Sequence, residues 1–353
     1  MSSYRVGEHE GTSVKRRKLG GLIGGAAAWS LWPPAARAQS APASGSSAGL
    51  SPGPTIGLLS SENFADWMIG GVRAGLAEYG FVDGQNLTII YRAAEGQPDR
   101  LPPMAADLVV ARVSAILATG GPLPTRAAKA ATTTIPIVFA YGGDPVADGL
   151  VASINRPGGN VTGATFIGAS LTAKRLEIMR ELVPQATDAA LLVNPRNTLA
   201  KGQAEDGLAA ARTLGLRLHV LNASNAAEMD EAFATMERLK VALAMVGVDP
   251  TFGITLRDQI VALGLRYRIP TMSESTSRGR VAGDGLIGYG PVLQDTWRQA
   301  GGYVGRILKG TKPSELPILQ PTRFELVINL RTARALGLDV PPRLLAIADD
   351  IVE

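Results

Sequence analysis

The chain has 353 residues, of which 46% are hydrophobic and 19% charged, with a formal net charge of +4. This length allows two domains, each with an apolar core of its own. The absence of cysteine excludes disulfides, thiolate catalysis and cysteine metal sites, and only His9 and His219 are available for a histidine metal site or a catalytic triad. The sequence has no lysine- and arginine-rich stretch interleaved with aromatic residues, so we expect no nucleic-acid partner.

The first 38 residues have the three parts of an export signal. Residues 15–18 are basic, residues 19–32 are small and apolar, and Ala36-Arg37-Ala38 is a small-x-small cleavage motif. The pair Arg16-Arg17 favours twin-arginine export, and an ordinary Sec signal or a retained anchor are the alternatives. Residues 39–54 are rich in Ser, Ala, Gly and Pro and predict a flexible leader. We therefore expect a periplasmic protein that is cleaved near Ala38 and is not embedded in the membrane.

From residue 55 onward, the pattern alternates strands and helices, and the alternation occurs twice. The first half predicts strands at 56–59, 87–91, 113–118 and 135–140 and helices at 67–79, 101–110 and 124–131. The second half predicts strands at 189–193, 216–221, 241–246 and 268–272 and helices at 203–214, 227–239 and 257–263. In each half a glycine, Gly80 or Gly215, caps the first helix, and an Ile-Pro pair with Pro136 or Pro270 marks the fourth strand. The pattern predicts an α/β fold of two Rossmann-like lobes with parallel sheets.

A ligand of such sheets binds outside the carboxyl ends of the strands, and two facing lobes form one cleft. These positions supply the candidate ligand-binding residues, which are Ser60, Ser61, Thr119, Gly120, Tyr141, Asp144, Asn194, Gly247, Asp249, Ser273 and, at an expected crossover between the lobes, Tyr289.

Each candidate also has a purely structural interpretation. Ser60 and Ser61 suit a carboxylate or cap a helix, and Gly120 admits a ligand to the backbone or forms a tight turn. Asp144 and Asp249 suit an ammonium group, but each precedes proline and is also typical of a turn start. Tyr289 would face the ligand or fix the hinge, which glycines such as Gly283 would assist.

Several segments taken in order carry a family resemblance. They include Gly24-Gly25-Ala26-Ala27-Ala28-Trp29, Tyr91-Arg92-Ala93-Ala94-Glu95-Gly96, Gly143-Asp144-Pro145-Val146, Asn155-Arg156-Pro157-Gly158-Gly159-Asn160-Val161-Thr162-Gly163 and Phe324-Glu325-Leu326-Val327-Ile328-Asn329-Leu330. With these segments the chain resembles the ABC transporter substrate-binding proteins that are related to tryptophan- and tyrosine-binding proteins.

The resemblance implies a type I periplasmic-binding-protein fold with three crossovers, near residues 158–165, 283–291 and 316–321. Lobe 1 would comprise residues 55–160 and about 290–315, and lobe 2 residues 161–285 and about 320–353. A helix at 294–308 and a strand at 324–330 would belong to the returning segments.

The implied function is to bind a small polar solute, an amino acid or a related carboxylate, and to deliver it to an ABC permease with its ATPase subunits. We expect a monomer with no cofactor, no metal and no catalytic residue. A periplasmic sensing subunit is the alternative. An enzyme is disfavoured because the sequence has neither a G-x-G-x-x-G fingerprint nor a Walker loop.

Overall fold

The computed structural model describes residues 53–166, 171–273 and 285–353. The predicted export signal, the predicted leader up to residue 52 and the predicted hinge residue Gly283 lie outside these residues. None of the helices within the described ranges combines the length and the apolar character that a membrane span requires.

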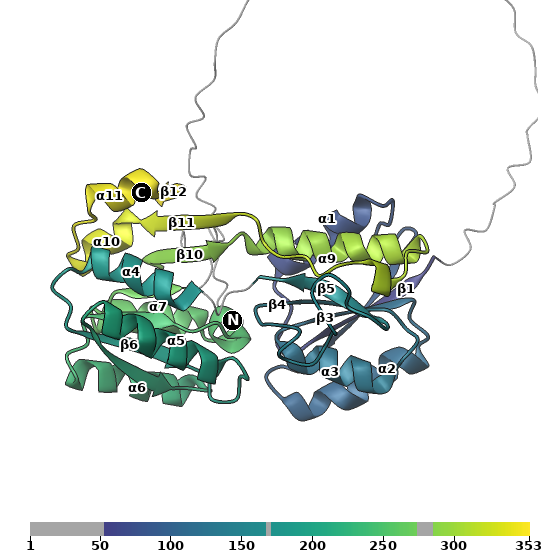
Figure 1. The fold of residues 1–353 in the computed structure, drawn as a ribbon, viewed down its shortest axis with the longest axis horizontal. Coiled ribbons are helices and arrows are strands. Elements are labelled where there is room, and N and C mark those ends of the chain that lie inside the picture. Colours follow the sequence, from purple (N-terminus) through teal and green to yellow (C-terminus); the bar gives the residue numbers. More distant parts are fainter. Residues whose placement is uncertain (1–52, 167–170, 274–284) are drawn as a thin grey trace, which may run out of the picture. The chain divides into compact units, whose positions relative to one another are not determined.

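Lobe 1 is built on a five-stranded parallel sheet in the order β2-β1-β3-β4-β5. Its strands are β1 (Thr55–Ser60), β2 (Thr88–Ala93), β3 (Ala115–Thr119), β4 (Ile137–Tyr141) and β5 (Val161–Thr165). Its helices are α1 (Asp66–Ala77), α2 (Leu101–Val110), α3 (Pro122–Ala131) and α9 (Leu293–Leu308), with short 3-10 turns η1 (Pro98–Arg100) and η4 (Pro313–Glu315). Figure 1 shows α1 and α9 on one face of the sheet and α2 and α3 on the other, and each pair covers its own cluster of buried side chains.

Lobe 2 is built on a seven-stranded sheet in the order β12-β11-β10-β9-β8-β6-β7. Its strands are β6 (Asp188–Val193), β7 (Arg217–Asn222), β8 (Leu243–Val246), β9 (Thr271–Ser273), β10 (Ile287–Pro291), β11 (Phe324–Asn329) and β12 (Asp350–Val352). All pairs of neighbouring strands are parallel except the pair of β10 and β11, which is antiparallel. Its helices are α4 (Thr172–Leu182), α5 (Ala200–Thr213), α6 (Ala226–Arg238), α7 (Arg257–Arg266), α10 (Leu330–Leu336), α11 (Pro342–Ile347) and the π-helix η3 (Thr251–Thr255).

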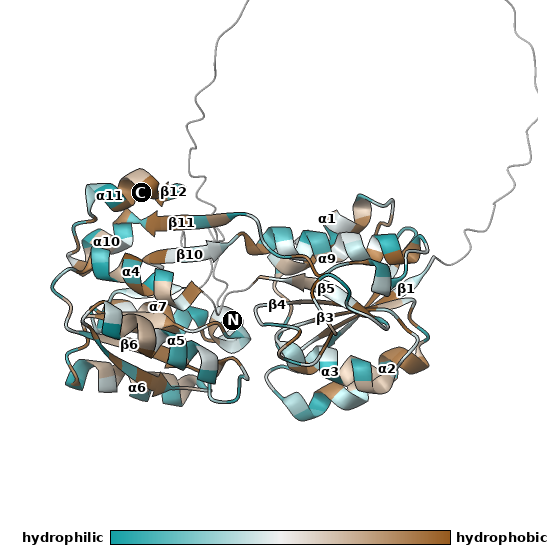
Figure 2. Cartoon of the chain, viewed as in Figure 1, coloured by the Kyte–Doolittle hydropathy of each residue, from teal (hydrophilic) through white to brown (hydrophobic). Residues whose placement is uncertain are grey.

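The hydrophobic pattern explains these elements. Strands β3, β4 and β6 are buried along their whole length because helices cover both faces of their sheets. Figure 2 shows that much of the teal, hydrophilic colour lies on the helices that surround the sheets. Gly80 and Gly215 have φ of +80° and +67°, as predicted for left-handed residues after a helix. Pro136 and Pro270 directly precede β4 and β9, where a missing N–H does not interrupt the sheet.

The first predicted crossover lies later in the chain than expected. The segment at 161–165 was expected to leave lobe 1, but it forms β5 and pairs with β4 from Ile137↔Val161 to Tyr141↔Thr165. The chain of lobe 1 therefore continues past residue 160, because this segment still satisfies the backbone groups of the sheet edge. Near residue 319 the chain pairs with β5, since the N–H of Leu319 donates to the carbonyl of Gly163. The third crossing therefore lies between residue 319 and β11.

Helices α1 and α9 pack closely because small residues face each other at their contact. A Cβ added to Gly75 would lie 1.9 Å from the carbonyl oxygen of Arg298, and one added to Gly301 would lie 2.3 Å from that of Val72. Any larger side chain would separate the helices. This packing fixes the first turns of α9, which contribute Leu293 and Trp297 to the site described next.

Candidate functional site

Two adjoining cavities lie between residues of lobe 1 and residues of lobe 2. The first, called here the apolar cavity, has a volume of about 50 Å³. One water needs about 10–15 Å³ on this scale, so the space corresponds to about four waters. Its wall is formed by Trp67, Met68, Thr119, Gly120, Gly121, Ala140, Tyr141, Gly142, Phe166, Asn197, Leu199, Val248, Asp249, Pro250, Gly253, Ile254, Leu293 and Trp297.

Aromatic side chains of lobe 1 form one side of the apolar cavity. The rings of Trp67 and Trp297 meet edge to face, with centroids 5.1 Å apart and planes at 73°. The ring of Phe166 lies 5.5 Å from that of Trp297. Such a wall offers an apolar or aryl group a large contact area and the edge-to-face geometry that aromatic rings prefer.

The second cavity, called here the polar cavity, has a volume of about 430 Å³. It shares Gly120, Gly121, Asn197, Asp249 and Pro250 with the apolar cavity. Among the described residues on its wall, the charged side chains are the carboxylates of Glu62, Glu95 and Asp249 and the guanidinium of Arg196. The polar cavity therefore presents both signs of charge beside an apolar space, with an excess of carboxylates.

Asp249 lies where the two cavities meet and is only 3% exposed. Its carboxylate accepts hydrogen bonds from Nδ2 of Asn197 at 2.7 Å and Nδ2 of Asn194 at 3.2 Å, and from the backbone N–H groups of Thr251 and Phe252. Burial raises the pKa of Asp249 above its ordinary value, and these hydrogen bonds oppose the rise. The carboxylate is thus held in a fixed position, and a cation beside it would favour its charged form.

Glu62 connects the two lobes and was not among the residues predicted from the sequence. Its carboxylate accepts a hydrogen bond from the hydroxyl of Thr251 at 2.9 Å and another from the hydroxyl of Thr255 at 2.8 Å. Glu62 is 5% exposed, and burial is the main cause that raises its pKa, with a smaller contribution from the charge of Asp249. Its position, two residues after the end of β1, is a signal that sequence reasoning could have used.

Six of the predicted residues lie on the walls of the two cavities, namely Ser61, Thr119, Gly120, Tyr141, Asn194 and Asp249. Gly120 has a φ of +85°, and a Cβ there would lie 2.3 Å from the hydroxyl oxygen of Ser61. The hydroxyl of Ser61 donates a hydrogen bond to the carbonyl of Gly120, and the hydroxyl of Thr119 donates to that of Ala140 at 3.0 Å. Both hydroxyls therefore stabilise the backbone at the strand ends.

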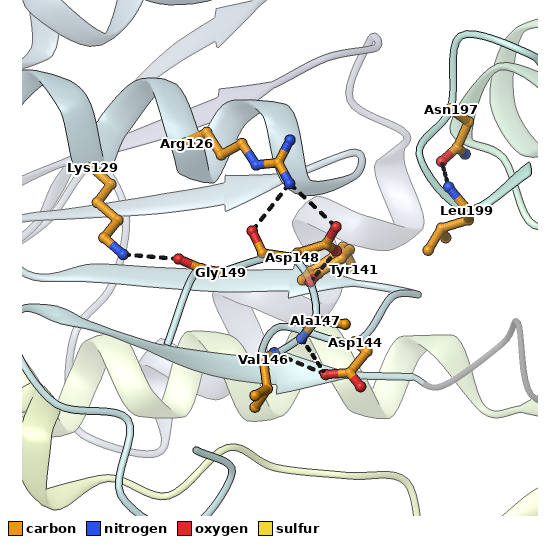
Figure 3. A network of polar contacts seen from close by, with 10 residues as sticks. All are labelled: Arg126, Lys129, Tyr141, Asp144, Val146, Ala147, Asp148, Gly149, Asn197 and Leu199. Carbon is orange, nitrogen blue, oxygen red and sulfur yellow. Dashed lines mark hydrogen bonds and ion pairs between the residues drawn. The ribbon is translucent and has the colours of Figure 1, made fainter. Parts of the chain in front are cut away.

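The loop that follows β4 is held by lobe 1 itself, as Figure 3 shows. The hydroxyl of Tyr141 donates to the carboxylate of Asp148 at 2.8 Å, while Arg126 and Lys129 of α3 donate to the carbonyls of Asp148 and Gly149. Burial is the main cause that raises the pKa of Tyr141, and the hydrogen bond to Asp148 adds to it. Tyr141 thus presents its ring to the apolar cavity while its hydroxyl is already bound.

Asp144 is exposed and is part of neither cavity wall. Its carboxylate accepts hydrogen bonds from the backbone N–H groups of Val146 at 2.8 Å and Ala147 at 3.1 Å (Figure 3). Of the two interpretations open for this Asp-Pro pair, the geometry favours the turn start over a contact with ligand.

Four other predicted residues lie away from the two cavities. Ser60 is buried, and its hydroxyl accepts from the N–H of Glu62 at 3.2 Å. A Cβ on Gly247 would lie 2.6 Å from the carbonyl oxygen of Leu192, so close strand packing accounts for this glycine. Tyr289 stacks on Phe324 within lobe 2, and Ser273 lines a separate cavity of that lobe. No cluster of three or more His, Asp or Glu side chains within the described ranges is arranged to hold a metal ion.

The aromatic residues Trp67, Phe166 and Trp297 were also missed by the sequence analysis. Trp67 and Trp297 lie in the first turns of helices, and Phe166 follows β5, which was expected to be a crossover. Their rarity was a signal that could have identified the two tryptophans. The chain has only four tryptophans, and two of them precede the predicted cleavage site. The remaining two are these cavity residues.

Comparison with known proteins gives a consistent result. Residues 59–352 match the model of the family described as ABC transporter substrate binding protein. The tyrosine-binding protein of Clostridioides difficile (strain R20291) is 25% identical over 264 residues, which are 74% of this chain and 74% of that protein.

Two solved structures share the fold. A Streptococcus pneumoniae ABC domain in complex with L-Trp superposes with a TM-score of 0.76 and 24% identity, over 85% of this chain and 100% of that chain. A conserved domain protein of Vibrio cholerae has a TM-score of 0.77 and 24% identity, over 84% of this chain and 99% of that chain. The predicted α/β fold, with two lobes and parallel sheets as in the type I periplasmic binding proteins, is confirmed.

Proposed function

Because the chain belongs to the family of ABC transporter substrate-binding proteins, we propose that it receives an aromatic amino acid, or a close carboxylate relative, for an ABC importer. The observation that carries this solute class is the junction of the two cavities at Asp249. Aromatic side chains border the apolar cavity, and the polar cavity beside it offers partners for charged groups. A solute with a ring at one end and a zwitterion at the other matches this arrangement.

The charged groups of the solute have specific partners in this proposal. The ammonium group lies at Asp249, whose carboxylate is already oriented by Asn194 and Asn197. The carboxylate lies toward Arg196 and the bare backbone of Gly120 and Gly121, where φ is +85° and +102°. Relatives whose names specify tyrosine or tryptophan as the ligand support this class of solute.

Export, lobe closure and delivery complete the proposed cycle. The segment 1–38 would direct the chain to the periplasm, where the mature protein begins near Gln39. Binding of the solute would favour the form in which residues of both lobes contact it, and this form would be the one that the permease and its ATPase subunits accept.

A thermal-shift screen of the chain from Gln39 tests the solute class. The panel holds the amino acids, aromatic acids, sugars and nucleosides. A solute that binds only the native state stabilises it by about 2.7 kcal/mol at a hundredfold excess over Kd. We expect the largest shifts with L-tyrosine and L-tryptophan. A shift with sugars or nucleosides alone would be consistent with the fold but would contradict the proposed solute class.

Delivery is tested by uptake in cells. Deletion of the gene should reduce accumulation of the labelled solute, and expression of the wild-type chain should restore it. A chain with Asp249→Asn that still folds and is still exported should not restore uptake. Normal uptake in the deletion strain would contradict the importer role.

A further inference from the structure

The indole N–H of Trp297 has no acceptor among the residues that the structure describes, although the side chain is only 4% exposed. Buried polar groups in folded proteins are almost always hydrogen-bonded, so an unpaired donor of this kind needs an explanation. The hydroxyl of Thr125 is the other buried polar side-chain atom without a partner in the described ranges, but Thr125 belongs to neither cavity wall. Trp297 differs because it lines the apolar cavity.

The hydroxyl and amide donors on this wall are already used. The hydroxyl of Thr119 donates to the carbonyl of Ala140, and the hydroxyl of Tyr141 donates to Asp148. The amide of Asn197 donates to the carbonyl of Val248 at 3.1 Å and to Asp249 at 2.7 Å, which uses both of its hydrogens. Trp67 also has a polar or ring partner. The N–H of Trp297 is therefore a buried side-chain donor on this wall with no partner among the residues that the structure describes.

The ring of Trp297 is held in place, so its N–H keeps one direction. Trp67 meets it edge to face, Phe166 packs at 5.5 Å, and its Cβ lies 3.0 Å from the position that a Cβ on Gly71 would occupy. A fixed donor in an apolar wall discriminates strongly between solutes with and without a hydrogen-bond acceptor. A solute without an acceptor leaves this N–H unpaired in the complex.

We propose that Trp297 is a specificity-determining residue, whose indole N–H donates a hydrogen bond to an oxygen on the distal end of the aryl solute. This inference rests on the proposed function, since it assumes that a ring occupies the apolar cavity. A hydroxyphenyl group supplies the oxygen acceptor, and an unsubstituted phenyl group does not. The charged ends of the solute have partners in the polar cavity, so the oxygen that meets Trp297 is carried by the ring.

The test compares L-tyrosine with L-phenylalanine by calorimetric titration of the chain from Gln39. The wild-type protein should bind L-tyrosine about tenfold more tightly than L-phenylalanine, and Trp297→Phe should reduce this ratio to about one by weakening the binding of L-tyrosine. Trp67→Phe is the matched control, because it removes an indole from the same wall and should leave the ratio unchanged. Thermal melts of both variants establish that they fold.

Tyramine, which has the ring oxygen but no carboxylate, identifies the oxygen that is bound. Trp297→Phe should weaken the binding of tyramine by the same factor as the binding of L-tyrosine. If Trp297→Phe weakened the binding of L-tyrosine but not of tyramine, the N–H would be assigned to the solute carboxylate and the inference would be overturned. An unchanged ratio of the affinities for L-tyrosine and L-phenylalanine in Trp297→Phe would also overturn it. Binding of neither amino acid to the wild-type protein would instead refute the proposed solute class, and the inference with it.

Discussion

Glu62 and Thr255 are 193 positions apart in the sequence, yet the hydroxyl of Thr255 donates a hydrogen bond to the carboxylate of Glu62 at 2.8 Å. With the second hydrogen bond from Thr251, this contact joins the end of β1 in lobe 1 to the π-helix η3 in lobe 2. It lies on the wall of the polar cavity, so the groups that join the lobes also border the proposed solute site.

Loss of this contact should weaken solute binding by favouring separated lobes. A hydrogen bond to a charged group contributes about 1.5–3 kcal/mol, so Glu62→Ala should raise Kd by about tenfold or more. The measurement is a calorimetric titration with the best solute of the screen, supported by stopped-flow rates. Glu95→Ala is the control, because Glu95 lines the same cavity but pairs with Arg100 within lobe 1 at 2.6 Å. Equal effects of the two variants would show that the bridge between the lobes has no special role.

Solute affinity should fall at acidic pH because the proposed ammonium partner must be ionised. Burial raises the pKa of Asp249, so this carboxyl group becomes protonated at a higher pH than an exposed aspartate would. As the pH falls through that raised pKa, the attraction to an ammonium group is lost. Titrations of the wild-type chain at a series of pH values should show this loss, and Asp249→Asn should bind weakly at every pH. Undiminished affinity in Asp249→Asn would place the ammonium group elsewhere.

The contact between α1 and α9 predicts opposite effects for two glycines of one helix. Gly75→Ala should destabilise the fold by roughly 1–3 kcal/mol, because the new methyl group meets the carbonyl of Arg298. Gly70 is exposed in the same helix and has no atom near its added Cβ, so Gly70→Ala should stabilise it by about 0.5–1 kcal/mol. Denaturant unfolding measures both changes. A stable Gly75→Ala variant would mean that the helices are not so tightly packed.

Asp188 predicts how stability changes with pH. Hydrogen bonds from Arg217 and His219 hold its pKa well below the ordinary value of 3.8. The folded state thus binds this proton less readily than the unfolded state, and the resulting stability is present above pH 3.8 and is lost as the pH falls below it. Unfolding by urea at decreasing pH should show a smaller acid-induced loss for Asp188→Asn than for the wild-type chain. Parallel curves for the two proteins would contradict this assignment.

The two-lobed fold could be predicted because each local pattern agrees with it. The repeated order of strands, helices, capping glycines and Ile-Pro pairs is present in the sequence around Gly80, Pro136, Gly215 and Pro270. The place of β5 could not be predicted, because a short segment such as residues 161–165 does not specify which sheet edge it will join. That choice depends on β4, which lies more than twenty positions earlier.

The candidate site could be predicted only in part, for the same reason. Asp144 and Asp249 both precede proline, and nothing local distinguishes them. The difference arises from distant partners, because Asn194 and Asn197 approach Asp249, whereas Asp144 bonds only to nearby backbone N–H groups in the contacts described above. The aromatic wall likewise joins Trp67 and Trp297, which are brought together by the packing of α1 on α9.

Tryptophan fluorescence of the chain from Gln39 tests most directly whether the solute binds between the lobes. Of the four tryptophans, Trp29 and Trp32 are absent from this chain, so all of its indole emission comes from Trp67 and Trp297 at the apolar cavity. Titration with L-tyrosine, with excitation selective for indole, should give a saturable change in emission whose Kd equals the calorimetric value. Calorimetric binding without any change in tryptophan emission would place the solute outside this cavity and contradict the proposed site.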